Sequence, residues 1–176
     1  PVIMCVDRAG IVGNDGETHQ GIFDLSFFNI VPNIEILAPK DFKELEQMME
    51  YAVNLNAPVV IRYPRGGESN EKFTNHPEIK EGKAEIIKKG NDITIVAIGK
   101  MVSRANNISK KLKENGIDAE VINARFLKPI DEDTILKSAI KTKRIVTIED
   151  NVEQIEEKYG MDEKSILSKI IEEINE

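Results

Sequence analysis

Short apolar runs separated by polar segments are the first regular feature of this chain. Residues 1–6, 31–39 and 58–63 have the length and the β-branched content of buried strands. Between the second and third runs, one face of a predicted helix from residue 42 to about residue 55 is apolar, at Leu45, Met48, Met49, Ala52 and Val53. Asp41 is predicted to cap this helix, and Glu44 is placed to complete a capping box.

The second half of the chain alternates strands and helices. Strands are predicted at 93–99, 119–123 and 144–149, and helices at 103–115 and 131–140, with Gly116 and Asp131 as caps. This order favours an α/β fold with a parallel sheet and right-handed crossovers. The polar residues 67–91 are predicted to be a linker with one weak strand at 84–87. The tail is predicted to end in an amphipathic helix with apolar positions at Ile166, Leu167, Ile170, Ile171 and Ile174.

Composition narrows the classes of function. The net charge is −7 and there is no Trp, so a nucleic-acid-binding face is not expected. No apolar run approaches the roughly 20 residues of a membrane span, so no membrane partner is expected. The single cysteine, Cys5, cannot form an internal disulfide, which favours a cytoplasmic protein. Cys5 itself is predicted to be a small buried apolar residue.

The densest polar segment, residues 7–21, directly follows the first predicted strand. It holds an arginine, a histidine and four glycines, and the ends of parallel strands are common ligand sites. Arg8 can bind a phosphate or carboxylate, Asp15 can hold a substrate hydroxyl, and His19 can exchange a proton near neutral pH. The alternative is a structural Asp7–Arg8 ion pair, with a turn at Asp15 and an exposed His19.

A second cationic segment, residues 62–66, follows the third predicted strand. In a parallel sheet this strand ends at the same edge as Asp7, so Arg65 can converge with Arg8 on one anion. The alternative is an arginine on a solvated turn. Residues 125–131 are predicted to be mainly a structural connection. Glu149 and Asp150 are predicted to be a solvated strand end rather than a metal site, because no His or Cys stands nearby.

Several of these segments resemble one known family. They are DRAGIVGNDGETHQGIFDLSFFNIVPNIEILAPKD, PVVIRYPRG, ARFLKPID, IEDNV and EKYGMDEKSI. Together they resemble the C-terminal part of the 1-deoxy-D-xylulose-5-phosphate synthase family, which is transketolase-like and depends on thiamine diphosphate. The resemblance implies part of a pyrimidine-binding domain at 1–66, a linker at 67–91 and a transketolase C-terminal α/β domain at 92–176. It also implies a missing segment near residues 152–153.

The same resemblance implies a reaction. Pyruvate would be decarboxylated on thiamine diphosphate, with Mg²⁺, and joined to D-glyceraldehyde 3-phosphate in the first step of the non-mevalonate isoprenoid pathway. By position, Arg8 and Arg65 would hold the phosphate, and Asp15 and His19 would be catalytic. The cofactor-binding residues belong mostly to an absent N-terminal portion, so this piece alone is expected to be inactive. A homodimer that includes that portion is expected.

Two alternatives stay open at this point. One is a separate transketolase-like or 2-oxo-acid dehydrogenase β-type subunit that joins a partner chain. The other is a non-catalytic regulatory or assembly module with the same fold. Arg8, Asp15, His19 and Arg65 together argue against such a module, because a protein that only bound partners would not need a converging phosphate site.

Overall fold

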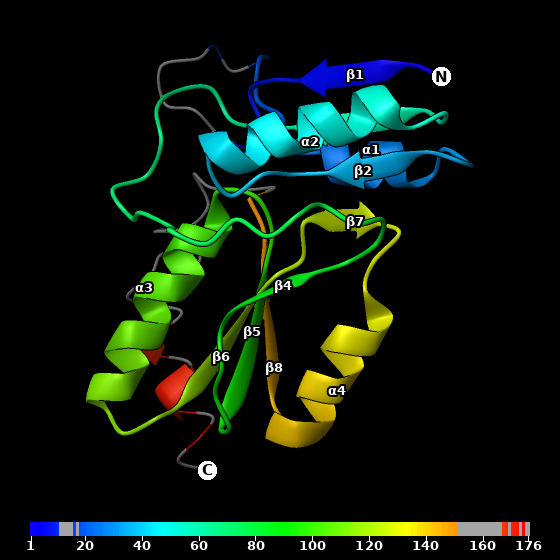
Figure 1. Cartoon of the computed structure of the whole chain (residues 1–176). Coiled ribbons are helices and arrows are strands. Elements are labelled where there is room, and N and C mark those ends of the chain that lie inside the picture. The colour runs from blue at the N-terminus through cyan, green and yellow to red at the C-terminus, as the bar shows by residue number, and fades with distance from the viewer. Residues whose placement is uncertain (11–15, 17, 151–166, 169, 173, 175–176) are drawn as a thin grey trace.

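The computed structural model describes residues 1–10, 16, 18–150, 167–168, 170–172 and 174. The described strands form two four-stranded sheets that lie one above the other (Figure 1). The strand order across the first sheet is β1 (Ile3–Val6), β3 (Val59–Arg62), β2 (Glu35–Leu37) and β7 (Phe126–Lys128). The second consists of β4 (Glu85–Lys88), β6 (Ala119–Asn123), β5 (Ile93–Ala97) and β8 (Ile145–Ile148). Only β7 and β4 run antiparallel to their neighbours, which confirms the predicted mainly parallel α/β class.

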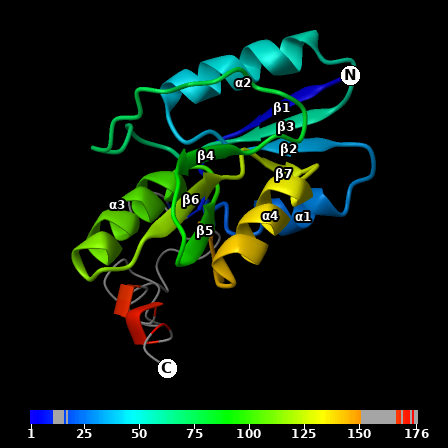
Figure 2. The same ribbon diagram turned by 60° about the horizontal axis from the view of Figure 1, so that its bottom comes forward.

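Helices α1 (Asp24–Asn29) and α2 (Phe42–Asn54) cover opposite faces of the first sheet (Figure 2). Side chains alternate along a strand, so Val59 and Ile61 pack against α2 while Val60 packs with Leu25 of α1. Because both faces are covered, β3 is apolar throughout except at Arg62. The helix α1 begins where the predicted glycine-rich loop ends, in a stretch for which the sequence pattern predicted no element.

Helices α3 (Met101–Glu114) and α4 (Glu132–Thr142) flank the second sheet in the same way, one on each side (Figure 1). Ile93 and Ile95 pack in the core beneath α3, whereas Thr94 points toward α4 and shares hydrogen bonds with Ser138 and Thr142, both at 2.8 Å. The described residues of the tail, 167–168, 170–172 and 174, are helical. Ile170 is buried in the core beneath α3, in agreement with the amphipathic pattern.

The predicted caps are present, with one change. Asp41 accepts a hydrogen bond from the Glu44 backbone N at 2.8 Å, and Asp131 accepts one from the Thr134 backbone N at 3.2 Å. The Glu44 carboxylate accepts from the backbone N of Lys40, at 2.8 Å, and not from that of the cap residue as a capping box requires. Glu44 is fully buried because it belongs to a charged network instead.

That network joins the two sheets. Its acids are Glu44 and Glu85, its bases are Lys40 and Arg125, and Asn123 donates to both acids. All five side chains are buried, and the two charges of each sign balance. Buried ions are tolerated only when they are paired in this way. The network therefore fixes how the two sheets sit relative to each other.

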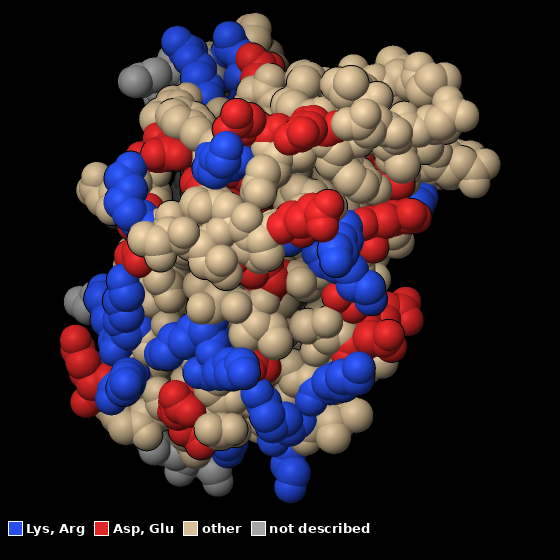
Figure 3. All heavy atoms as spheres, viewed as in Figure 1, with Lys and Arg blue, Asp and Glu red and all other residues tan. Residues whose placement is uncertain are grey.

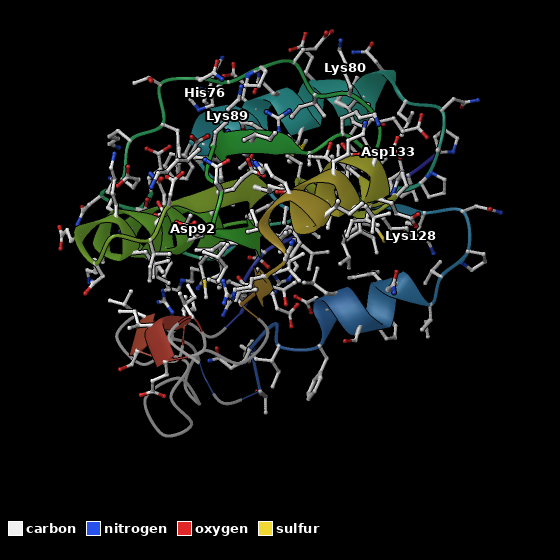
Figure 4. The ribbon with its side chains drawn as sticks, turned by 90° about the horizontal axis from the view of Figure 1, so that it is seen from below. His76, Lys80, Lys89, Asp92, Lys128 and Asp133 are labelled. Carbon is white, nitrogen blue, oxygen red and sulfur yellow. The ribbon has the colours of Figure 1, made fainter. Side chains whose placement is uncertain are left out.

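A strand from the second half of the chain strengthens this junction. Residues 126–128, predicted to be only a connection, form β7 and pair with β2. Lys128 reaches beyond the sheet and donates to the carbonyls of Asn29, at 3.1 Å, and Val31, at 2.7 Å, so that it lies between α4 and α1 (Figure 4). The first sheet is thus completed by residues that the sequence pattern assigned to the other half.

Two further predictions were wrong. Cys5 is exposed because β1 is an edge strand, and its thiol contacts the Met49 sulfur at 3.7 Å. Asp150 is buried, whereas a solvated strand end was predicted. Among the described residues, no helix combines the length and the apolar character that a membrane span requires.

Candidate functional site

The two predicted cationic segments leave adjacent parallel strands at the same end. Val6 of β1 pairs with Arg62 of β3, and Tyr63 donates its N–H to the Val6 carbonyl at 3.0 Å. The Ala9 N–H then donates to the Tyr63 carbonyl at 3.1 Å. Arg8 therefore lies beside Tyr63, two residues before Arg65, at the edge where open α/β sheets bind ligands.

The loop that carries His19 is closed at its base. Gly10 donates to the Gly21 carbonyl at 3.1 Å, and Gly21 donates to the Arg8 carbonyl at 3.0 Å. A Cβ at Gly21 would lie only 2.5 Å from the Arg8 carbonyl O and 2.4 Å from an Asp24 carboxylate O. Glycine is therefore required where the two ends of the loop meet.

Arg8 has a constrained backbone. Its φ is +59°, a left-handed conformation that costs a non-glycine residue energy and is concentrated at functional sites. Backbone hydrogen bonds of its neighbours hold this conformation in place. Its guanidinium is partly exposed, and its Nε lies 3.9 Å from the Asp7 carboxylate. The ion pair that was the alternative reading of this segment is thus present but long, and it leaves Arg8 partly open to solvent.

Arg62 lies beneath this loop and was not singled out from the sequence. Its buried guanidinium donates to the Gly21 carbonyl at 2.9 Å, to Asp24 at 3.3 Å and to Asp150. It thereby ties the closed end of the loop to the end of β8. A Cβ on Gly10 would also lie 2.7 Å from the Asp150 carbonyl O, so the loop and that strand end are in close contact. The available signal was a lone arginine within an apolar strand.

Arg65 faces the second half of the chain. It lines a cavity of about 350 Å³ between residues 64–69 and the start of α3, together with Lys100, Ser103 and Arg104. The lining holds three cations, Arg65, Lys100 and Arg104, against one acid, Glu68, so the cavity favours an anion. Tyr63 directly follows β3 and accepts a hydrogen bond from Ala9, and burial, together with the charges of Cys5 and Asp7, raises the pKa of its phenol.

His19 is exposed at the C-terminal side of the loop. Its N–H donates to the Gly16 carbonyl at 2.9 Å, and its Nδ1 lies 3.1 Å from the Thr18 hydroxyl. Asp15, the other predicted catalytic residue, lies outside the described residues, as do the predicted gap near 152–153 and the EKYGMDEKSI segment. The segments that carry Arg8 and Arg65 therefore leave the same end of the first sheet, and His19 lies on the loop that follows Arg8.

The described residues offer no metal centre of their own. Nowhere in 1–10, 18–150 or the described tail positions do three His, Cys, Asp or Glu side chains gather as metal ligands do. Asp24 and Asp150, the carboxylates nearest the loop base, are both bonded to Arg62. No chemical step is therefore assigned to a metal held by this part of the chain.

Family models match both halves of the chain. Residues 1–67 match the transketolase pyrimidine-binding domain, and residues 82–157 match the transketolase C-terminal domain. Among curated proteins, the chain is 49% identical over 153 residues to 1-deoxy-D-xylulose-5-phosphate synthase of Clostridium acetobutylicum. It is 48% identical over 152 residues to the synthase of Caldanaerobacter subterraneus subsp. tengcongensis. Each match covers 86% of this chain, which spans only about a quarter of either relative, 25% and 24%.

Solved structures agree with this fold. A split-gene transketolase, described as an inactive β4 tetramer, superposes with a TM-score of 0.76 at 33% identity. That match covers 84% of this chain and 47% of the other. Transketolase from Campylobacter jejuni superposes with a TM-score of 0.76 over 97% of this chain and 31% of its own. Its identity is 19%, so this second likeness supports the fold alone.

Proposed function

The chain belongs to the transketolase family, and from this premise we propose that it is the C-terminal part of a 1-deoxy-D-xylulose-5-phosphate synthase. The reaction would join pyruvate to D-glyceraldehyde 3-phosphate with release of CO₂. We also propose the domain division 1–66, 67–91 and 92–176. The relatives' similarity over most of the chain supports the first proposal. The family models, over residues 1–67 and 82–157, support a division into two domains, and β4, within the proposed linker, pairs with the second sheet.

One observation carries the assignment of the site. The backbone hydrogen bond from Ala9 to Tyr63 supports the proposal, because it joins the segment that carries Arg8 to the segment that carries Arg65 at the end of two paired strands. Two guanidinium groups at one edge can bind a phosphate through charge-assisted hydrogen bonds. Such a clamp would fix the phosphorylated aldehyde and orient its carbonyl for attack, which lowers the entropic cost of the reaction.

The catalytic roles are assigned to Asp15 and His19. His19 lies on the loop that follows Arg8 and closes at Gly21. Exposed to solvent, its imidazole can donate to a substrate carbonyl or hydroxyl near neutral pH. Asp15, four residues earlier, would accept a hydrogen bond from a substrate hydroxyl. Arg62 is a positioning residue, because it holds the Gly21 carbonyl at the end of this loop.

Thiamine diphosphate, which the transketolase-family domains imply, supplies the electron sink that stabilises a two-carbon carbanion when it is bound. We propose that it and Mg²⁺ are held mainly by residues outside this chain. This chain would then supply substrate binding and orientation at the edge described above.

An arginine substitution tests the proposal. In the full-length enzyme, R65A is expected to raise the KM for D-glyceraldehyde 3-phosphate by about tenfold or more with little effect on the KM for pyruvate. The control is R144A, an exposed arginine just before β8. An unchanged KM for the aldehyde would show that Arg65 does not bind the phosphate and is an arginine on a solvated turn.

A binding experiment tests the role of the missing portion. The isolated 176-residue chain, titrated with thiamine diphosphate and Mg²⁺ in a calorimeter, is expected to show no saturable binding and no turnover of pyruvate. Micromolar affinity with turnover would contradict the proposal that the cofactor site lies elsewhere.

We propose an oligomer as the working form, a homodimer that includes the N-terminal portion. Three apolar side chains at or beside α1 are largely exposed, Phe23 at 71%, Phe27 at 62% and Ile30 at 78%. Such a patch is typical of a protein interface. F27D is expected to lower the molar mass measured by light scattering, whereas an unchanged mass would exclude this patch as the interface.

A second candidate is a separate subunit that pairs with a partner chain. It is favoured by the likeness to the split-gene transketolase, whose match with this chain covers 47% of that protein. Intact mass measurement of the protein purified from its own cells separates the two candidates. A single long polypeptide supports the first, and two copurifying chains support the second.

A further inference from the structure

A second cavity lies away from the loop described above. It has a volume of about 580 Å³, within the range of small-molecule sites. One wall is the segment Glu71–Asn75, the second is the end of β4 and the third is the exposed side of α3. Segments far apart in sequence thus enclose one space.

Cations dominate this cavity. Its lining includes the lysines Lys72, Lys88, Lys110 and Lys113 and the acids Glu71 and Glu114, an excess of two positive charges on a chain whose net charge is −7. Figure 3 shows lysine and arginine side chains gathered on this face, across α3 and β4. A local excess of this kind attracts anions against the charge of the whole molecule.

Two of these lysines have no carboxylate partner among the described residues. Lys88 is half-buried and donates only to the carbonyl and hydroxyl oxygens of Ser109, at 3.1 and 3.4 Å. Lys113 is exposed and forms no recorded ion pair, whereas Lys110 binds Glu71 at 2.7 Å. Burial lowers the pKa of Lys88, and Lys113 and Lys110 lower it further against the opposing charge of Asp118. A bound anion would relieve this repulsion.

The rest of the lining is apolar. Phe73 and Ile87 are partly buried against the core beneath α3. The ammonium of Lys40 lies 5.6 Å from the centre of the Phe73 ring, so one contact fixes that ring to the buried network between the sheets. A fixed aromatic ring beside ammonium groups that have no carboxylate partner suits a ligand that has a flat apolar body and an anionic end.

We propose that this cavity binds an organic phosphate of about mononucleotide size. The phosphate would lie on Lys88 and Lys113, and an aromatic ring would pack on Phe73 and Ile87. The site is separate from the Arg8–Arg65 edge and does not depend on the proposed reaction. Carboxylates are a poorer fit, because a phosphate monoester carries up to two negative charges and three acceptor oxygens, which match the excess of two positive charges in the lining.

The test is titration of the purified protein with AMP, followed by calorimetry. Saturable binding is expected, with adenosine and inorganic phosphate each at least about tenfold weaker, since each keeps only half of the contacts. AMP binding no tighter than adenosine binding would overturn the proposal.

Substitutions locate the site. K113M and K88M are each expected to weaken AMP about tenfold, because each removes one charge-assisted contact. K89M is the matched control, since Lys89 is the next residue, exposed and labelled in Figure 4. F73L is expected to weaken AMP and adenosine alike, and R65A is expected to change neither.

Two outcomes contradict this assignment. Equal AMP affinity in K113M and K89M would exclude the lysine contacts, and K113M is decisive even if K88M folds poorly, since Lys113 is exposed. Loss of AMP binding in R65A would show that the nucleotide binds instead in the cavity lined by Arg65 and the first turn of α3.

Discussion

The Arg62 guanidinium and the Asp150 carboxylate form a buried ion pair between β3 of the first sheet and the end of β8 in the second. The same guanidinium binds the carbonyl of Gly21, where the loop that carries His19 closes. One side chain thus links the loop that follows β1 to the neighbouring sheet. The position of the loop depends on the arrangement of the two sheets.

Removal of the Asp150 charge is expected to destabilise the protein. D150N leaves the buried Arg62 without its full counter-charge, and breaking a buried ion pair typically costs about 3 kcal/mol. The free energy of unfolding in urea measures the effect. D133N, on the exposed side of α4 (Figure 4), is the control, with a change of less than about 0.5 kcal/mol expected. Equal losses of unfolding free energy in D150N and D133N would show that the Arg62–Asp150 pair does not stabilise the fold.

The buried network predicts a similar contrast on one helix. E44Q leaves Lys40 and Arg125 with a single acid between them, so a loss of about 3 kcal/mol is expected. E46Q removes an exposed carboxylate of the same helix, whose pair with Lys43 is worth less than about 1 kcal/mol. Urea unfolding compares the two. A loss in E44Q no greater than in E46Q would show that the network contributes little to the junction.

Substitutions of the two histidines are expected to have different effects, one on catalysis and the other on stability. H19N removes the proposed proton donor on an exposed loop, so kcat should fall by about 10² or more while stability changes little. H76N breaks the 2.7 Å contact with Asp41, the helix cap, so it should lower stability and leave kcat intact. Figure 4 shows His76 beside α2, apart from the loop. An unchanged kcat in H19N together with a lower kcat in H76N would show that His19 has no catalytic role.

Glu35 predicts a dependence of stability on pH. Burial raises the pKa of Glu35 above its ordinary value of 4.5, although the Tyr51 hydroxyl donates to it at 2.8 Å and opposes the shift. Because the folded pKa is the higher one, the native state favours the protonated acid. This stabilisation is complete below the unfolded pKa and is lost as the pH rises through the folded pKa.

E35Q cannot ionise, so it isolates this contribution. The free energy of unfolding of the wild-type protein should fall relative to that of E35Q as the pH rises from about 4 to about 7. Urea unfolding at several pH values across that range gives the difference. E50Q, on the exposed face of α2, should show no such trend relative to the native protein. A rise relative to E35Q would reverse the assigned sign.

The spacing of apolar residues along the chain was sufficient to predict most of the helices and strands. The helix at 42–55, the strands at 58–63 and 119–123 and the cap at Asp131 follow from local spacing and side-chain chemistry, which the neighbours of a residue in sequence largely decide. The chemistry of residues 7–21 was equally visible, because an arginine, a histidine and four glycines after a strand rarely form an ordinary turn. The family resemblance rests on the segment that contains those residues and on four further segments along the chain.

Long-range pairing decided the rest. Residues 126–128 became a strand only because β2 offered an open edge, and no local signal distinguishes such a strand from a connection. Cys5 is exposed because β1 lies at the edge of the sheet, and Asp150 is buried because Arg62 reaches it from a strand 88 residues away in sequence.

The sequence by itself determined which residues can bind a phosphate or transfer a proton, since that is the chemistry of each side chain. Only the tertiary structure decided which of them share an edge and which charge is neutralised by which partner. The physical reason is that burial and ion pairing depend on distance in space, and hydrogen bonds between strands bring together residues that the chain itself keeps far apart.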